Sequence, residues 1–193
     1  WHYYFAQIIM ASSKENIPEQ RKVVLEEHNP EWLILAEQEK KKLLSQLPIE
    51  IIEIYHIGST SIPGIKAKPI LDFVVEVGQM KDLLDSQDIL IRLGYTPKGE
   101  SGIPGRQFFT KDTNGSRSHH LHAFETGHPD IIRHIAFRDY LRSNPEAARE
   151  YEELKEELAQ KYPKKSGDYT EAKSDFILTM DQVARSWYEE YHS

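Results

Sequence analysis

The sequence contains no cysteine, so neither a disulfide nor a thiolate metal site is available to it. It also lacks any apolar run close to the ~20 residues that span a bilayer, and we expect no membrane partner. The formal net charge of −7 argues against a nucleic-acid-binding protein that works by phosphate neutralisation. A chain without cysteine suits a reducing compartment, and we expect a cytoplasmic protein.

Composition sets the domain organisation that we expect. The chain has 193 residues, of which 39% are hydrophobic and 28% charged, as is typical of one globular domain. The first ten residues are rich in aromatic side chains and do not begin with methionine. We therefore predict that residues 1–17 are an N-terminal extension or a remnant of cloning, and that residues 18–193 form a single domain.

Hydrophobic periodicity predicts an α+β fold, in which a mixed sheet is flanked by helices and the helical C-terminal third packs on one side. Strands are expected at residues 23–25, 49–57, 68–77, 95–98, 106–111 and 116–125. Helices are expected at residues 30–47, 80–93, 129–142, 145–161 and 169–188. Asn114-Gly115 predicts a tight hairpin turn, because both residues accept positive φ.

A turn rich in small residues follows the strand at 49–57. Gly58 lets the backbone approach a ligand, and the hydroxyls of Ser59, Thr60 and Ser61 can hold anionic oxygens. On the next strand, Asp72 is suited to a divalent metal ion that in turn holds phosphate. The alternative is an ordinary connection in which the glycine serves the turn and the aspartate is merely half-exposed.

A His-x-His pattern lies on the predicted strand at 116–125. His120 and His122 share one face of that strand with Cα atoms ~7 Å apart, so both imidazoles can bind one transition metal or contact phosphate. If this strand lies beside the Asp72 strand, the three side chains form one mixed site for Mg²⁺, Mn²⁺ or Zn²⁺. The alternative is a pair of partly buried histidines that are satisfied by the backbone.

Three cations are candidates for neutralising phosphate charge. Lys68 is expected on the Asp72 strand, Arg106 at the start of its own strand, and Lys173 in the first turns of the last helix. For each residue taken alone, a surface salt bridge is the alternative.

Several separated motifs resemble those of the GrpB family. They are residues 23–25, 29–32, 56–64, 68–72, 119–122, 137–141 and 169–174. The resemblance implies a nucleotidyltransferase fold of the polymerase-β type, in which a Gly-Ser turn precedes a strand with two alternating acids. Gly58-Ser59 matches the turn and Asp72 the first acid, whereas Val74 stands in the position of the second acid. A histidine, His120 or His122, occupies the expected third position.

The resemblance implies a protein that binds a nucleotide or another phosphorylated small molecule, with Asp72 and His122 as candidate catalytic residues. Glu76 does not replace the missing acid, because its Cα lies ~13 Å from that of Asp72 on an extended strand. A metal-dependent nucleotidyltransferase with an incomplete carboxylate set is the first hypothesis. The second is an accessory module that binds a nucleotide or coenzyme A without turnover. A metal-dependent phosphoester hydrolase on the same pocket is the third.

Overall fold

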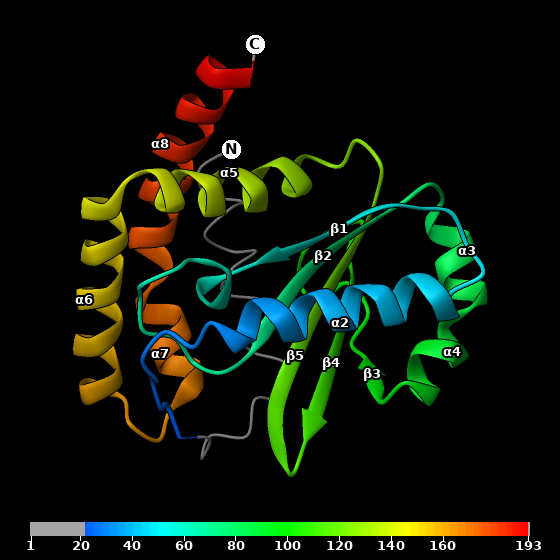
Figure 1. Cartoon of the computed structure of the whole chain (residues 1–193), viewed down its shortest axis with the longest axis horizontal. Coiled ribbons are helices and arrows are strands. Elements are labelled where there is room, and N and C mark those ends of the chain that lie inside the picture. Colours follow the sequence, from blue (N-terminus) through cyan, green and yellow to red (C-terminus); the bar gives the residue numbers. More distant parts are fainter. Residues whose placement is uncertain (1–21, 193) are drawn as a thin grey trace.

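A computed structural model describes residues 22–192, and in it five strands form one mixed sheet (Figure 1). The strand order is β1-β2-β5-β4-β3, with β2 and β5 parallel and the other neighbours antiparallel. The strands are β1 (Ile51–Ile57), β2 (Leu71–Val77), β3 (Tyr95–Pro97), β4 (Gln107–Thr113) and β5 (Ser116–Glu125). The predicted extension at residues 1–17 lies outside the described residues.

Helices cover both faces of this sheet and stand beside one of its ends (Figure 1). They are α2 (Glu31–Gln46), α3 (Met80–Asp85), α4 (Gln87–Arg92), α5 (Pro129–Ser143), α6 (Pro145–Lys161), α7 (Ser166–Ala172) and α8 (Ser174–His192), and a 3-10 turn, η1, spans Ser59–Ser61. The α+β prediction is therefore confirmed. Among residues 22–192, no helix combines the length and the apolar character needed to cross a bilayer.

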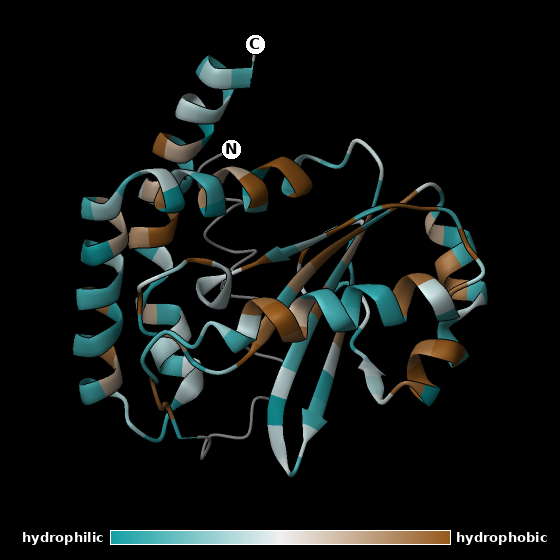
Figure 2. Ribbon diagram, viewed as in Figure 1, coloured by the Kyte–Doolittle hydropathy of each residue, from teal (hydrophilic) through white to brown (hydrophobic). Residues whose placement is uncertain are grey.

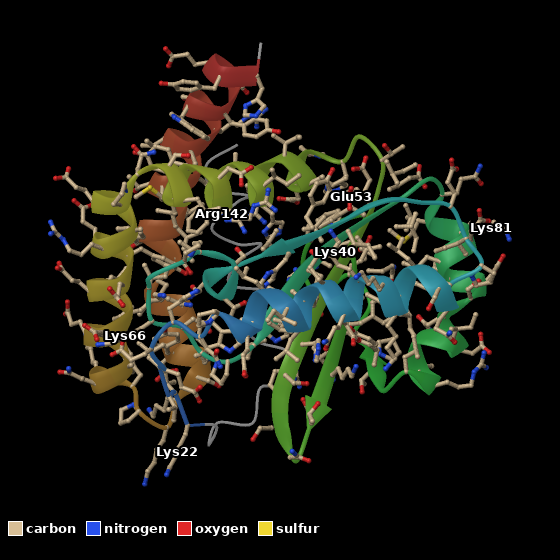
Figure 3. The ribbon with its side chains drawn as sticks, viewed as in Figure 1. Lys22, Lys40, Glu53, Lys66, Lys81 and Arg142 are labelled. Atoms are coloured by element: carbon tan, nitrogen blue, oxygen red, sulfur yellow. The ribbon has the colours of Figure 1, made fainter. Side chains whose placement is uncertain are left out.

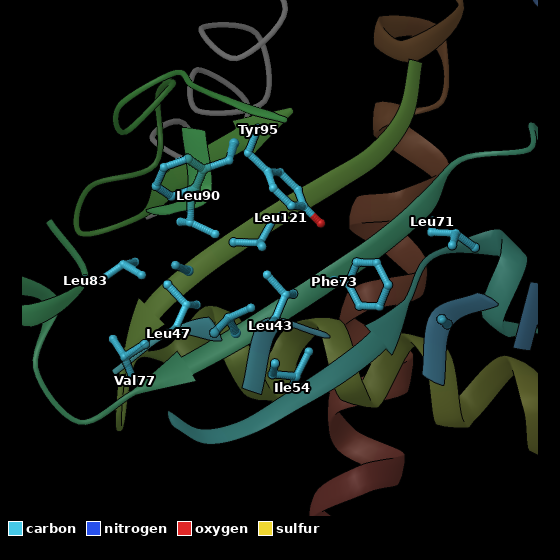
Figure 4. Packing of buried hydrophobic residues seen from close by; sticks show 14 of the residues in the cluster. Leu43, Leu47, Ile54, Leu71, Phe73, Val77, Leu83, Leu90, Tyr95 and Leu121 are labelled. Carbon is cyan, nitrogen blue, oxygen red and sulfur yellow. The ribbon is translucent and has the colours of Figure 1, made fainter. Parts of the chain in front are cut away.

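The larger core lies between the sheet and α2 (Figure 4). Alternate residues of β2 point into it, and Phe73 is fully buried there against side chains of α2 such as Leu43. Each such buried side chain contributes about 1.5–3 kcal/mol relative to an exposed one. Figure 2 shows the matching hydropathy, with apolar stretches in β1 and β2 and a mostly hydrophilic α6. Because these residues occupy one face of β2, Asp72 lies on the opposite face.

The opposite face of the sheet carries a second apolar cluster that α5 covers. Its buried members are Ile57, Val74, Phe124, Ile131 and Ile135. Asp72 and Glu76 lie on this face on either side of Val74, and Glu76 accepts a hydrogen bond from the Thr126 hydroxyl at 2.6 Å. Glu76 is thus engaged away from Asp72, as the strand arithmetic predicts.

Several predicted elements agree closely with the structure. The strand at 116–125 and the helix at 145–161 are confirmed with the same bounds. The hairpin turn is confirmed by φ angles of 53° at Asn114 and 75° at Gly115. The 3.6-residue period of α2 and α5 also predicts their bounds to within two residues.

Other predictions are wrong in detail. Residues 23–25 form no strand, because Val23 packs against Leu158 and Tyr169 of the C-terminal helices. The helix expected at 80–93 is two short helices that meet at Ser86. The last helix begins earlier than expected and is interrupted at Lys173. That interruption places Lys173 at a helix junction.

Candidate functional site

The Gly58-Ser59 turn lies directly against Asp72. Gly58 has φ 70° and ψ −175°, a conformation that side-chain-bearing residues rarely adopt. A Cβ at this position would lie 2.5 Å from the Oδ2 atom of Asp72. Glycine is therefore required here for two reasons, the backbone angle and the close approach of the carboxylate.

The three predicted hydroxyls of the turn have different environments. Ser61 is buried and its hydroxyl donates to the Gly58 carbonyl at 2.6 Å. Thr60 is buried and donates to the Ile70 carbonyl at 3.1 Å, so His56 Nε2 is the donor in its 2.9 Å bond to Thr60. Ser59 is half-buried. Ser59 is thus the hydroxyl of the three that remains accessible to a ligand.

Helices α5 and α6 hold the loop that contains the turn (Figure 3). Arg142 of α5 donates two hydrogen bonds to the Ser61 carbonyl, at 2.9 and 2.7 Å. The backbone N–H of Lys66 donates to Glu152 of α6 at 2.6 Å. The loop is therefore fixed at the C-terminal end of η1 and again at Lys66 by charge-assisted hydrogen bonds, which are stronger than neutral ones.

Asp72 and His120 form a hydrogen-bonded pair across β2 and β5. The two residues are in register, and the distance from Asp72 Oδ1 to His120 Nδ1 is 2.8 Å. An ionised carboxylate only accepts, so Nδ1 of His120 is the donor, and Nε2 has a lone pair in the neutral form of the ring. The side chains are 25% and 28% exposed, respectively, so solvent reaches both. The condition for a shared site, that the two strands lie side by side, is therefore met.

His122 has a different partner. It lies opposite Val74, and its Nδ1 is 3.2 Å from a guanidinium nitrogen of Arg106. Because a guanidinium only donates, Nδ1 is the acceptor and the neutral ring carries its proton on Nε2. Burial and the Arg106 charge hold the pKa of His122 well below its usual value. Neither ring nitrogen then offers a lone pair to a metal ion.

The donor set does not form a metal site on its own. Residues 22–192 contain no group of three or more His, Asp or Glu side chains arranged to hold a metal ion. Asp72 contributes one carboxylate, already bonded to His120. A protein-held Mg²⁺, Mn²⁺ or Zn²⁺ ion needs more ligands than these two.

Arg106 is also engaged by the protein. Its guanidinium donates to the carbonyls of Glu100 and Ser101 at 3.1 and 2.6 Å, and the residue is 3% exposed. The loop at 99–105 is therefore held by Arg106. The phosphate role predicted for this arginine stays a prediction, and its present partners oppose it.

Lys68 and Lys173 converge on one aromatic ring near Asp72. Their Nζ atoms lie 4.9 and 4.5 Å from the centroid of Tyr169. Lys68 precedes β2 instead of lying on it, because Pro69 has no N–H for the sheet ladder and the strand begins at Leu71. Burial, Lys68 and Lys155 lower the pKa of Lys173 to about 7, and Asp72 opposes this effect.

Three residues of this cluster are absent from the sequence predictions. Burial raises the pKa of Tyr151 to about 12 and the Ser59 hydroxyl opposes this effect, Lys155 lies over the Tyr151 ring at 4.7 Å, and Tyr169 is shared by the two lysines. Tyr151 and Lys155 look like ordinary residues of an amphipathic helix. The sequence feature that hints at this cluster is the four-residue spacing of Tyr169 and Lys173, because residues four apart are neighbours on a helix surface.

The cluster is partly open to solvent, since the side chains of Asp72 and His120 are about one quarter exposed. Two surface hollows share Leu33 and Arg142 as lining residues, and Asp72 lines neither of them. We call the group of Gly58, Ser59, Lys68, Asp72, His120 and Lys173 the Asp72 site. Its polar and cationic groups suit an exposed anionic ligand better than an enclosed apolar one.

Known proteins of one family are similar to this chain in sequence. The family model described as "GrpB protein" matches residues 22–182. YqkA from Bacillus subtilis is 43% identical over 86% of this chain, and the chain spans about half (48%) of that relative's length. Glutamate-rich protein GrpB from Alkalihalophilus pseudofirmus is 38% identical over 80% of this chain and 91% of its own.

Solved structures show the same relationship. Conserved protein GrpB from Enterococcus faecalis has a TM-score of 0.81 and 36% identity, over 86% of this chain and 99% of that one. The Cid1 poly(U) polymerase, solved with MgATP bound, has a TM-score of 0.50 and 14% identity, over 83% of this chain and 49% of that one. This second likeness concerns the fold alone and confirms its distant similarity to nucleotidyltransferases.

Proposed function

This chain belongs to the GrpB family, and we propose that it binds the phosphate groups of a nucleotide or of another phosphorylated small molecule at the Asp72 site. The observation that carries the proposal is the convergence of Lys68 and Lys173 on one ring beside the Gly58-Ser59 turn. Ammonium groups held together in this way can form charge-assisted hydrogen bonds with a phosphate group. The MgATP complex of the distant fold relative supports a phosphate ligand in this class of fold.

In this proposal each residue of the site has a part in binding. The Ser59 hydroxyl is half-buried at the open side of the turn and is suited to a phosphate oxygen. The two ammonium groups neutralise the charge of the phosphate. Asp72 orients His120, whose Nε2 keeps a lone pair for a proton of the ligand. No step in this proposal passes through a metal ion.

An accessory module without turnover is the second candidate, and Val74 favours it. In the pattern that the family resemblance implies, a second acid belongs at this position. Val74 is fully buried in the apolar cluster with Ile57 and Phe124, so the surroundings are built for a hydrocarbon side chain. Release of pyrophosphate or phosphate from ATP by the purified protein would rule this candidate out.

Thermal unfolding with added ligand tests the proposal. ATP, inorganic pyrophosphate and coenzyme A are each added with Mg²⁺, Mn²⁺, Zn²⁺ or EDTA, and adenosine is the control that lacks phosphate. A ligand at about 100 times its Kd stabilises by about 2.7 kcal/mol, which raises Tm by roughly 5–10 °C in a chain of this size. We expect such a rise with at least one phosphate compound and none with adenosine.

A matched pair of variants locates the ligand. Ser59→Glu places a negative charge beside the turn and is expected to abolish the ligand-induced rise in Tm. Ser45→Glu, on the exposed end of α2, is expected to leave it unchanged. Equal responses of the two variants, or no response of the unmodified protein to any phosphate compound, would contradict the proposed function.

A further inference from the structure

A part of the sheet beside the Asp72 site carries aromatic rings that the proposed function does not use. His120 and His122 share one face of β5, and Phe108 of β4 lies opposite His122 in the antiparallel register. The ring centroid of Phe108 is 5.5 Å from that of His120 and 4.8 Å from that of His122. We call Phe108, His120 and His122 the ring face.

The ring face is partly open to solvent. Its three residues are half-buried, and the side chain of His120 is 28% exposed. Among the described residues, α5 packs chiefly over β1 and β2, on the other side of β5 from β4 (Figure 1). His134 of α5 lies at the border of the ring face, with its centroid 5.3 Å from that of His122. A flat ring of a ligand can therefore reach this face beside α5.

Arg106 holds the ring face in place. Its guanidinium carbon lies 4.9 Å from the centroid of Phe108, and one of its nitrogens is 3.2 Å from Nδ1 of His122. The same guanidinium is fixed by the carbonyls of Glu100 and Ser101. The rings therefore lose little conformational freedom when a ligand binds, which reduces the entropic cost of binding.

The charged groups around the ring face are of both signs. Asp72 accepts a hydrogen bond from His120, and Arg133 of α5 is paired with Asp130 and Asp181. Burial and nearby guanidinium groups hold the pKa of His122 well below its ordinary value, so its ring is neutral near pH 7. Binding of a neutral aromatic group at this face therefore does not depend on an unpaired cation.

The ring face continues the Asp72 site across the sheet. His120 belongs to both, because its Nδ1 bonds to Asp72 at 2.8 Å. β5 lies between β2 and β4, so the strand of Phe108 runs about 10 Å from the strand of Asp72. In a nucleotide, the ribose and the first phosphate separate the base from the outer phosphates by a distance of this order.

We propose that the ring face is a nucleobase subsite, and that the ligand of the Asp72 site is a nucleoside di- or triphosphate whose base stacks on Phe108 and the two imidazoles. This inference rests on the proposed function and makes its ligand class more specific. Every base has a π-face, and stacking on an aromatic side chain strengthens binding by about 5- to 150-fold. A phosphate compound without a base lacks this contribution.

Isothermal titration calorimetry of the full chain in one Mg²⁺ buffer tests this inference. The ligands are ATP, GTP, CTP, UTP and inorganic tripolyphosphate, which has the same three linked phosphates without a nucleoside. We expect at least one nucleotide to bind about fivefold or more tightly than tripolyphosphate. Tripolyphosphate carries at least as much negative charge as the nucleotides, so such a preference is not electrostatic.

A matched pair of variants locates the base. Phe108→Leu removes the half-buried ring and keeps an apolar side chain. We expect it to reduce the preference for the nucleotide at least about fivefold and to change the Kd of tripolyphosphate less than about twofold. Phe109→Leu removes the next ring of β4, which is fully buried on the other face of the sheet, and is expected to keep the preference.

The preference is a ratio of two affinities for the same folded protein, so a loss of stability in either variant does not imitate the result. The unmodified protein also tests the inference without any variant. Equal or weaker binding of every nucleotide relative to tripolyphosphate would overturn the nucleobase subsite and leave the proposed function standing.

Two further outcomes would contradict the argument at different points. A nucleotide preference that survives Phe108→Leu would overturn the assignment of the base to the ring face. Absence of binding of all five compounds would overturn the proposed function, and the inference with it.

Discussion

At the scale of single residues, Gly58 determines where the Asp72 carboxylate can lie. Its backbone angle and the 2.5 Å approach of a Cβ to Asp72 Oδ2 are separate constraints. Gly64 in the same loop has φ 83° but no atom within 4 Å of a Cβ. Both glycines thus have a positive φ, and of the two Gly58 adds the contact with Asp72.

We expect Gly64→Ala to cost about 1–2 kcal/mol of unfolding free energy, which is the strain of positive φ alone. Gly58→Ala should cost more, because the added methyl group also displaces Asp72 from His120. Urea unfolding measures both values. Equal destabilisation by the two substitutions would show that the contact with Asp72 has no energetic consequence.

At the scale of elements, the sequence predicts the existence of most helices and strands because their apolar periods are strong. Interruptions of helices are harder to predict. Nothing in residues 80–93 shows that the helix ends at Ser86 and a new one begins, and nothing in the sequence shows the junction at Lys173. Apolar periodicity alone does not predict the candidate site. The pairing of Asp72 with His120 depends on parallel pairing between strands 48 residues apart, and the pattern within either strand does not determine it.

The contacts of Arg106 are likewise not visible in the sequence pattern. They lead to a prediction about the loop that this residue holds. Its guanidinium holds the carbonyls of Glu100 and Ser101. We expect Arg106→Met to cost about 2–3 kcal/mol, because the two carbonyls lose charge-assisted hydrogen bonds from a buried guanidinium. Amide hydrogen exchange should also quicken at residues 99–105.

Arg92→Met is the control for this prediction, because Arg92 forms an exposed pair with Asp88 and is expected to contribute less than about 1 kcal/mol. Unchanged exchange in the loop of the Arg106 variant would mean that the loop is held by other contacts, such as the bond from Gly105 N–H to Glu100.

At the scale of the whole molecule, buried imidazoles link stability to pH. Burial lowers the pKa of His56 and of His119 to about 4 from an ordinary value of 6.5. Burial also holds the pKa of His122 and His134 well below that value. A folded-state pKa below the unfolded one means that the unfolded chain binds protons first. These histidines therefore favour the folded state above pH 6.5 and disfavour it as the pH falls.

We expect the unfolding free energy to fall between about pH 6.5 and pH 4, with His56 alone contributing up to about 3 kcal/mol. Asp181 works in the opposite sense, because burial raises its pKa to about 6 and its contribution is lost as the pH rises through that value. Urea unfolding across this range measures the sum. His56→Gln should flatten the acid limb, and an unchanged slope in that variant would contradict the assignment.

The distance along the chain between Gly58 and Lys173 has a consequence for synthesis. A ribosome that adds about 5–20 residues each second releases the turn and β2 well before the junction of α7 and α8. During that interval the nascent chain carries Lys68 and Asp72 but not Lys173, so the proposed ligand site lacks one of its ammonium groups. Under the proposed function, the site is complete only after the C-terminal helices dock.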